Sequence, residues 1–162
     1  MPEMDMIDQI IGIYQKQIEQ YQNLAALYER EKLNLTQGRG DEKAEEIMML
    51  VASKDDLMRQ VEIQREQAKG LQQKMMEQFG IHDFRLSLLK PHILPEQKEA
   101  LKKVLDQIGT ELLRIRSLDT ENQKLLQEYM ENHQTQPEQK SIDQALEIYR
   151  QSIQQGNLLK KL

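Results

Sequence analysis

Residues 4–28 read MDMIDQIIGIYQKQIEQYQNLAALY, and their apolar side chains recur at alternating steps of three and four. This spacing places them on one side of an α-helix. The stripe consists of Met4, Ile7, Ile11, Tyr14, Ile18, Tyr21, Ala25 and Tyr28. Ile10 and Leu24 make the stripe broader than a two-stranded coiled coil requires. The pattern therefore predicts a long helix that packs against two neighbouring helices.

A second long helix is expected directly after the first. Gly38-Arg39-Gly40 interrupts the helical pattern after about Gln37, and the Asp41 side chain offers an oxygen to cap the next helix. We expect this second helix to run from about Asp41 to Phe79, where Gly80 ends it. Its apolar stripe consists of Ile47, Leu50, Leu57, Val61, Ala68, Leu71 and Met75. A connection this short makes the two helices antiparallel.

The third long helix begins at Pro95, because a proline in the first helical turn lacks only a donor that would have no partner there. It is predicted to reach about Gln134, and residues 81–94 are predicted to form a loop with one short helix. The apolar stripe of the third helix consists of Leu101, Leu105, Ile108, Leu112 and Ile115, and then shifts through Leu118 to Asn122, Leu125, Leu126 and Tyr129. At 1.5 Å per residue, each long helix spans roughly 50 to 60 Å. The expected fold is all-α: an elongated antiparallel bundle of three long helices with a short central helix.

A polar segment with Pro137 follows the third helix and predicts a linker. Beyond it, one face of a short C-terminal amphipathic helix is formed by Ile142, Leu146, Tyr149 and Ile153. Helices shorter than about 12 to 15 residues are marginal alone, so this helix needs a docking surface. We therefore expect a bundle domain at residues 1–136 and a linker with a tail helix at residues 137–162.

Some residues in the apolar stripes have two interpretations. Lys54 interrupts the stripe of the second helix, where its stem can lie along apolar surface with the ammonium at the rim, or where a polar group fixes the register. Asn122 lies in the stripe of the third helix. The tyrosines at positions 14, 21 and 28 are expected to pack in the core; the alternative is a partly open groove that receives an incoming helix.

The overall composition argues against several classes of protein. A net charge of −5 and a pI near 5.3 argue against nucleic-acid binding, which needs clustered Lys and Arg. Cysteine is absent, which excludes disulfides and Cys-based zinc sites. No stretch approaches about 20 apolar residues, so no stable membrane insertion is expected.

Catalytic and metal-binding motifs are also missing. A carboxylate-bridged metal site in a helical bundle needs a Glu three residues before a His. The residues three positions before His82, His92 and His133 are Phe79, Leu89 and Met130. The glycines at positions 38 and 40 lack the length and the following Lys of a phosphate-binding loop. We expect no catalytic residues, no metal, no cofactor and no enzymatic activity.

Two motifs resemble those of the FlgN family. Gly40-Asp41, followed by a helical stretch and Lys54-Asp55-Asp56-Leu57, is similar to the family's Gly-Asp and Lys-x-x-Leu. Residues 118–126, LDTENQKLL, are similar to Leu-Asn-x-x-Asn-x-x-Leu-Leu, with Asp119 where the family usually has Asn. Asp can accept hydrogen bonds at the same place. The resemblance covers about residues 4–133.

The resemblance implies a cytoplasmic chaperone that holds the hook-filament junction proteins FlgK and FlgL before delivery to the flagellar type III export apparatus. Recognition would place a client helix in an apolar groove. The client-binding residues expected in the tail are Ile142, Leu146, Tyr149 and Ile153, and those in the third helix are Leu118, Asn122, Leu125 and Tyr129. A homo-oligomer is a further possibility.

An alternative from a different class is a structural coiled-coil protein, or an adaptor protein of another secretion or assembly system. A structural protein would use the same apolar stripes to associate permanently with copies of itself.

Overall fold

The structure, a computed structural model, describes residues 5–37 and 40–132. These residues form four α-helices: α1 (Met6–Gln37), α2 (Gly40–Phe79), α3 (Leu86–Leu89) and α4 (Pro95–Asn132). One 3-10 helix, Lys90–His92, joins α3 to α4, and the described residues contain no strand. The predicted all-α class is confirmed. Gly38, Arg39, the Asp41 side chain, and the predicted linker and tail helix lie outside the described part.

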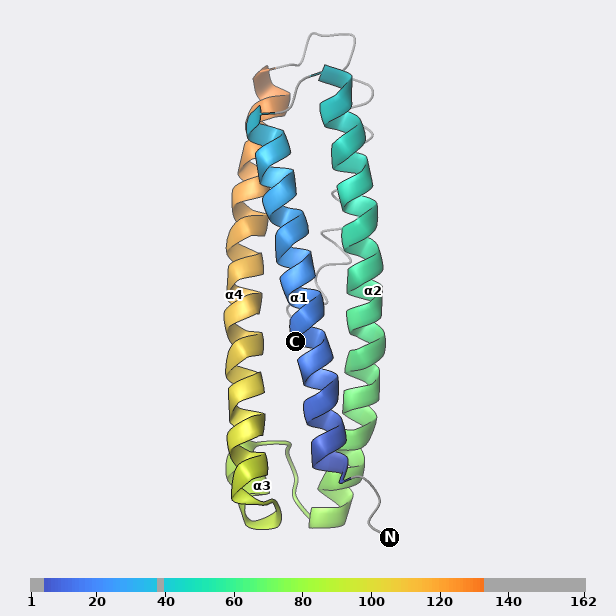
Figure 1. The fold of residues 1–162 in the computed structure, drawn as a ribbon, viewed down its shortest axis with the longest axis vertical. Helices are drawn as coiled ribbons and strands as arrows, with labels where there is room; N and C mark the ends of the chain where they lie inside the picture. The colour runs from blue at the N-terminus through green and yellow to red at the C-terminus, as the bar shows by residue number, and fades with distance from the viewer. Residues whose placement is uncertain (1–4, 38–39, 133–162) are drawn as a thin grey trace.

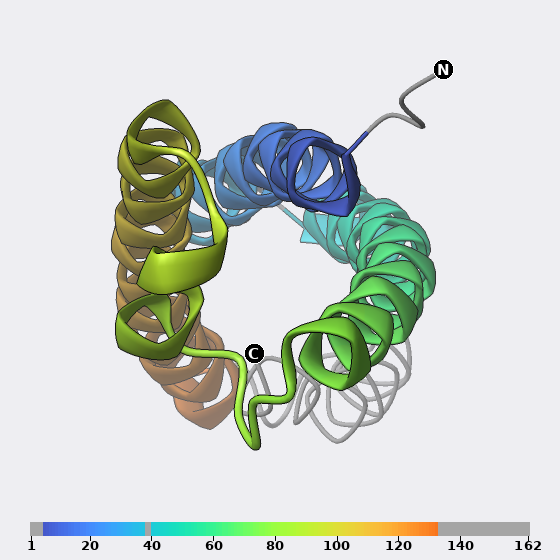
Figure 2. The same cartoon turned by 90° about the horizontal axis from the view of Figure 1, so that it is seen from below.

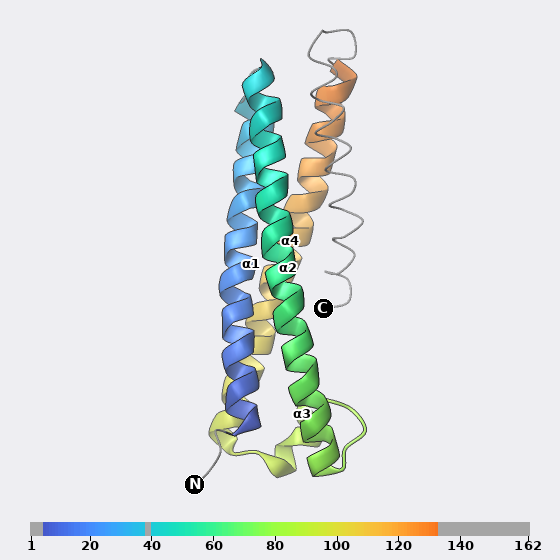
Figure 3. The same cartoon turned by 90° about the vertical axis from the view of Figure 1, so that its right-hand side faces the viewer.

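The three long helices run side by side, with α1 between α2 and α4 (Figure 1). Along the chain α2 runs opposite to α1, and α4 runs opposite to α2 (Figure 1). α1 packs extensively against both neighbours, whereas the described parts of α2 and α4 make no comparable contact with each other. The end-on view shows α1 flanked by the two other helices (Figure 2), and the side view shows α4 tilted across them (Figure 3).

The broad stripe of α1 accounts for its central position. The main line of apolar residues from Ile7 to Tyr28 is buried, and so are the flanking Ile10 and Leu24; Met4 lies outside the described residues. An α-helix whose apolar face is this wide can cover two partners at once. The prediction of two neighbouring helices is therefore confirmed.

The buried faces of α2 and α4 differ in detail from the predicted stripes. Val51 and Met58 are buried in α2, while Leu57 and Leu71, which were expected in the stripe, are only half-buried. Leu105 of α4 is 39% exposed. The reason is that α2 and α4 each pack mainly on α1, so apolar residues turned away from α1 are left without full cover.

Hydrogen bonds join the beginnings of α1 and α4 at the lower end of the bundle. The Ile7 backbone N–H donates to Asp5 Oδ1 at 3.1 Å, which caps α1. Gln97 Nε2 donates to Asp5 Oδ2 at 2.7 Å, and Gln97 Oε1 accepts from the Leu94 N–H at 2.9 Å. Gln97 therefore caps α4 and ties it to the capping residue of α1.

The chain leaves α2 as the sequence predicts. Gly80 has a φ of 67°, in the left-handed region that favours glycine at a helix end. The Phe79 ring then stacks on the His92 ring, with 4.7 Å between the centroids. This contact holds the link from α2 to α4 against the end of the bundle.

Candidate functional site

Polar side chains from three helices meet inside the upper half of the bundle. Lys54 Nζ of α2 donates to Glu31 Oε2 of α1 at 2.7 Å, and Asn122 Nδ2 of α4 donates to Glu31 Oε1 at 2.9 Å. Lys54 and Glu31 are each 1% exposed and Asn122 is 0% exposed. We call Tyr28, Glu31, Lys54, Asp119 and Asn122 the polar cluster. Glu31 is the residue to which both other helices bind.

Tyr28 connects the remaining members of the polar cluster. Its backbone oxygen accepts from Asn122 Nδ2 at 2.8 Å, and Lys54 Nζ lies 4.3 Å from the centre of its ring. Its hydroxyl donates to Asp119, and burial, followed by the nearby charges of Asp119 and Glu31, raises the pKa of Tyr28. Asp119 also accepts from Gln123 Nε2 at 2.8 Å. Asp119 thus accepts hydrogen bonds, as expected for this departure from the motif.

The expectation that the Lys54 ammonium reaches the rim was wrong. The ammonium is buried because Glu31 pairs with its charge and the Tyr28 ring lies beside it. The interpretation that Lys54 fixes the register fits this geometry, since a buried ion pair is stable only when its partners are correctly aligned. The sequence pattern did not identify Glu31 as the partner of Lys54 and Asn122. Its place in the stripe of α1, three residues after Tyr28 and four before Leu35, was the signal.

A pocket of about 390 Å³ opens in the lower half, where all three long helices contribute side chains. α1 supplies Tyr14, Gln17 and Tyr21; α2 supplies Arg65, Ala68, Lys69 and Gln72; α4 supplies Leu105 and Ile108. We call this the α2–α4 pocket. Gln72 Nε2 donates to the Tyr14 hydroxyl at 2.6 Å, so this residue pair bridges α1 and α2 at the pocket.

The three tyrosines of α1 are buried, as the core interpretation predicts. Tyr14 and Tyr21 also line the α2–α4 pocket, which is the feature that the alternative interpretation describes. Each of these side chains therefore contributes to the core and to the pocket. Tyr28 belongs to the polar cluster instead.

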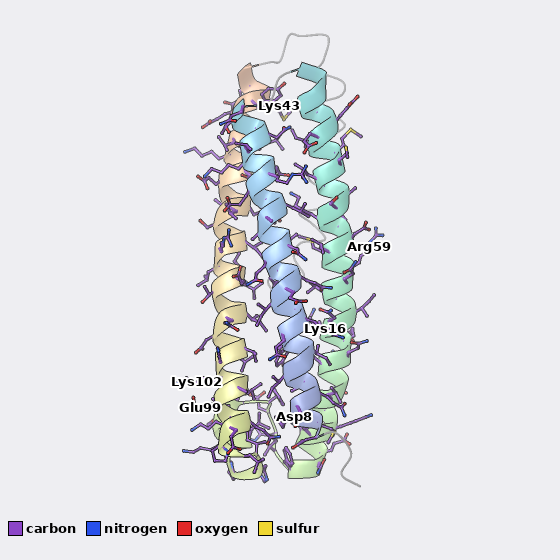
Figure 4. All side chains as sticks on the ribbon, viewed as in Figure 1. Asp8, Lys16, Lys43, Arg59, Glu99 and Lys102 are labelled. Atoms are coloured by element: carbon purple, nitrogen blue, oxygen red, sulfur yellow. The ribbon has the colours of Figure 1, made fainter. Side chains whose placement is uncertain are left out.

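The predicted client-binding residues of α4 do not line the α2–α4 pocket. Leu118 and Asn122 are buried between α4 and α1, and Leu125 and Tyr129 are half-buried near the upper end. Lys43, at the same end of α2 (Figure 4), places its Nζ 3.9 Å from the centre of the Tyr129 ring. The tail residues, Ile142, Leu146, Tyr149 and Ile153, lie outside the described residues. The structure therefore leaves only part of the α4 set accessible.

Residues 5–37 and 40–132 contain neither a metal-binding cluster nor a membrane-spanning helix. Within these ranges, His, Asp and Glu side chains form no group of three or more that could hold a metal ion. No helix in the same ranges combines the length and the hydropathy needed to cross a membrane.

The sequence matches the model of a known protein family. The family model described as FlgN protein matches residues 4–158. The chain belongs to the FlgN family. Membership implies the general role of a flagellar export chaperone. The match continues past residue 133, where the motifs end, and includes most of the predicted tail. No curated protein and no solved structure matches the chain.

Two residues of the FlgN motifs lie in the interior of the bundle. Lys54 and Asn122, which carry much of the resemblance, are both bound to Glu31 in the interior. Their side chains therefore hold the three helices in register. Because both side chains are buried, they offer no surface to another protein in this arrangement of the FlgN family chain.

Proposed function

We propose that this chain is a cytoplasmic flagellar export chaperone without enzymatic activity, which binds FlgK and FlgL by helix-in-groove contacts. The main support is the pocket of about 390 Å³ that all three long helices line, where the described parts of α2 and α4 contact each other far less than they contact α1. An amphipathic client helix can place its apolar face in such a groove. Family membership supplies the general chaperone role on which this proposal builds.

The groove suits reversible protection of a client. An unfolded or partly folded client segment exposes apolar side chains that would otherwise associate with one another. Contacts with the pocket residues cover those side chains and form no covalent bond. Release at the flagellar export apparatus then requires only that the client form a competing contact there in place of its contact with the groove.

The tail is a second part of the proposal. Ile142, Leu146, Tyr149 and Ile153 either contact the client or occupy the groove until the client displaces them. On α4, Leu125 and Tyr129 are accessible enough to contact a client without rearrangement. A client contact at Leu118 or Asn122 requires α4 to separate from α1, because both side chains are buried.

Calorimetric titration of the full chain with purified FlgK, and separately with FlgL, tests the function. Saturable binding to either protein is expected, and binding to neither would contradict the proposal. Replacing the four apolar tail residues with Ser should weaken binding while the helical circular dichroism stays unchanged. Unchanged affinity in that variant would remove the tail from the proposal.

Sedimentation at low concentration distinguishes the chaperone from a structural coiled-coil protein. A chaperone stays dissociated and forms a complex when FlgK is added. Permanent self-association, with no effect of FlgK, would support the structural alternative.

A further inference from the structure

The charges around the α2–α4 pocket differ from those of the chain as a whole. The sequence has 27 acidic and 22 basic residues, yet the charged residues that line the pocket are Arg65 and Lys69, with no carboxylate. Arg65 Nη1 contacts Glu62 Oε2 at 3.2 Å along α2, and Glu62 is not among the lining residues. Lys69 is exposed and has no ion pair among the described residues. One wall of the pocket is therefore basic.

The floor of the pocket contains a buried polar group without a partner among the described residues. The Tyr21 side chain is 0% exposed, and its hydroxyl has no hydrogen-bond partner among the described residues. Gln17, one turn earlier on α1, is also buried beside it. Buried polar groups are nearly always hydrogen-bonded in native proteins. A buried hydroxyl without a partner beside an opening indicates that something else supplies its hydrogen bond.

The chemistry of these groups selects an acceptor. Tyr21 keeps its proton near neutral pH, because burial raises the pKa of its hydroxyl, and a protonated hydroxyl can donate. Arg65 and Lys69 donate only. A carboxylate accepts from all of these groups and has the charge that complements the basic wall.

The α4 side of the pocket is apolar. Leu105 is partly exposed there, with Ile108 half-buried beside it. A volume of about 390 Å³ is near the lower limit for ligand pockets, which suits a few side chains better than a folded domain. The occupant must therefore combine a carboxylate with neighbouring apolar side chains.

We propose that the α2–α4 pocket receives an Asp or Glu side chain, with its apolar neighbours, from an amphipathic helix of the client. This inference rests on the proposed chaperone function and adds the chemistry of the bound segment. The carboxylate accepts hydrogen bonds from Tyr21 and from Arg65 or Lys69. The apolar neighbours of that carboxylate pack on Leu105 and Ile108.

Charge reversal of the basic wall tests this inference in the full chain. The variant Arg65→Glu/Lys69→Glu is compared with Arg59→Glu/Lys102→Glu, which makes the same change in charge. Arg59 and Lys102 are exposed, do not line the pocket, and point away from α1 (Figure 4). We expect the pocket variant to bind FlgK about tenfold more weakly than wild type, and the control variant to bind within about twofold of wild type.

Salt dependence gives a second measurement on the same proteins. Raising the salt from about 50 to about 300 mM should weaken FlgK binding to the wild type and to the control, and have less effect on the pocket variant. Thermal melts by circular dichroism establish that both variants remain folded. Equal affinities for the pocket and control variants would overturn the inference, while FlgK binding by the wild type would still support the proposed function.

A synthetic peptide tests the pocket independently of FlgK. The probe is a capped amphipathic helix of about 18 residues, roughly 27 Å long, with Leu at every third or fourth position and one Glu beside that stripe. The same peptide with Gln in place of Glu is the control. Tighter binding of the Glu peptide, lost in Arg65→Glu/Lys69→Glu, supports the inference even if FlgK does not bind. Equal binding of the two peptides would overturn it.

The chain's own tail is the main competing occupant, since it also carries Asp143 and Glu147. If the tail fills the pocket, Asp143→Asn/Glu147→Gln in the full chain should increase the affinity for the Glu peptide. That result would overturn the assignment of the pocket to the client. Unchanged affinity would support the assignment.

Discussion

α1 places buried polar side chains in both halves of the bundle, but their hydrogen bonding differs between the two halves. In the upper half, Glu31 binds Lys54 and Asn122, so all three long helices are joined at one carboxylate. About 15 Å lower, at 1.5 Å per residue, the Tyr21 hydroxyl has no hydrogen-bond partner among the described residues, in a pocket that Arg65 and Lys69 also line. The groups that pair with Glu31 fix how the helices pack, whereas the unpaired Tyr21 hydroxyl beside an opening indicates a site for another chain.

The largest expected effect comes from removing one partner of the buried ion pair. Lys54→Met leaves the Glu31 carboxylate in the interior without a cation, and we expect a loss of about 3 to 5 kcal/mol in the free energy of unfolding. Urea denaturation measures this loss. The double variant Lys54→Met/Glu31→Leu should recover most of it, because the uncompensated charge is then gone. A loss below about 1 kcal/mol in the single variant would mean that the pair does not hold the helices together.

Two tyrosines give a matched test of the difference between the halves. Tyr28→Phe removes a hydrogen bond to the Asp119 carboxylate and should lower the free energy of unfolding by about 1.5 to 3 kcal/mol. Tyr21→Phe removes a hydroxyl without a described partner and should change it by about 0.5 kcal/mol or less. Equal losses in the two variants would mean that the Tyr21 hydroxyl is satisfied within the chain.

The buried tyrosines also predict how stability depends on pH. Burial raises the pKa values of Tyr14, Tyr21 and Tyr28 above the usual 10.0. The folded state therefore holds these protons more tightly than the unfolded state. Their contribution to stability is complete below pH 10 and is lost as the pH rises above it. At pH 11, one unit above the usual tyrosine pKa, Tyr21 and Tyr28 should each account for about 1.4 kcal/mol of lost stability.

Urea denaturation between pH 8 and 11 measures this loss, and Tyr21→Phe provides the control. The variant should show a shallower decline above pH 10, since one of the three shifted groups is absent. Absorbance that shows all five tyrosines titrating near pH 10 in the folded chain, without unfolding, would contradict the prediction for the three buried residues.

The smallest expected effect comes from an ion pair on the surface. Arg114 Nη2 contacts Glu29 Oε1 at 3.1 Å, with about half of each side chain exposed. Water and salt screen such pairs, so Arg114→Ala should cost about 0.2 to 1 kcal/mol in urea denaturation. A loss as large as that of Lys54→Met would show that burial does not distinguish the two ion pairs.

Periodicity predicted the long helices because their apolar spacing is a local property of the chain. The broad stripe of α1 also predicted two neighbours correctly. The spacing did not determine how far α2 and α4 are rotated about their own axes relative to α1. That is why Leu57 was expected to be more buried than it is, and why Leu105 was not recognised as partly exposed.

The functional features were predicted only in part for the same reason. Lys54 and Asn122 were recognised as polar residues in apolar stripes, but their shared partner Glu31 comes from a helix distant in sequence. The spacing of Tyr14 and Tyr21 indicated a possible groove. The basic wall did not emerge, because Arg65 and Lys69 become neighbours of those tyrosines only when α2 packs on α1.

Methyl NMR of the full chain, recorded while FlgK is added, tests most directly whether the pocket binds the client while the polar cluster holds the bundle. We predict saturable shifts for Leu105 and Ile108 at the α2–α4 pocket, with little change for Val51 and Leu126, which are buried in the upper half. Saturable shifts at Val51 and Leu126, with Leu105 and Ile108 unchanged, would contradict this account.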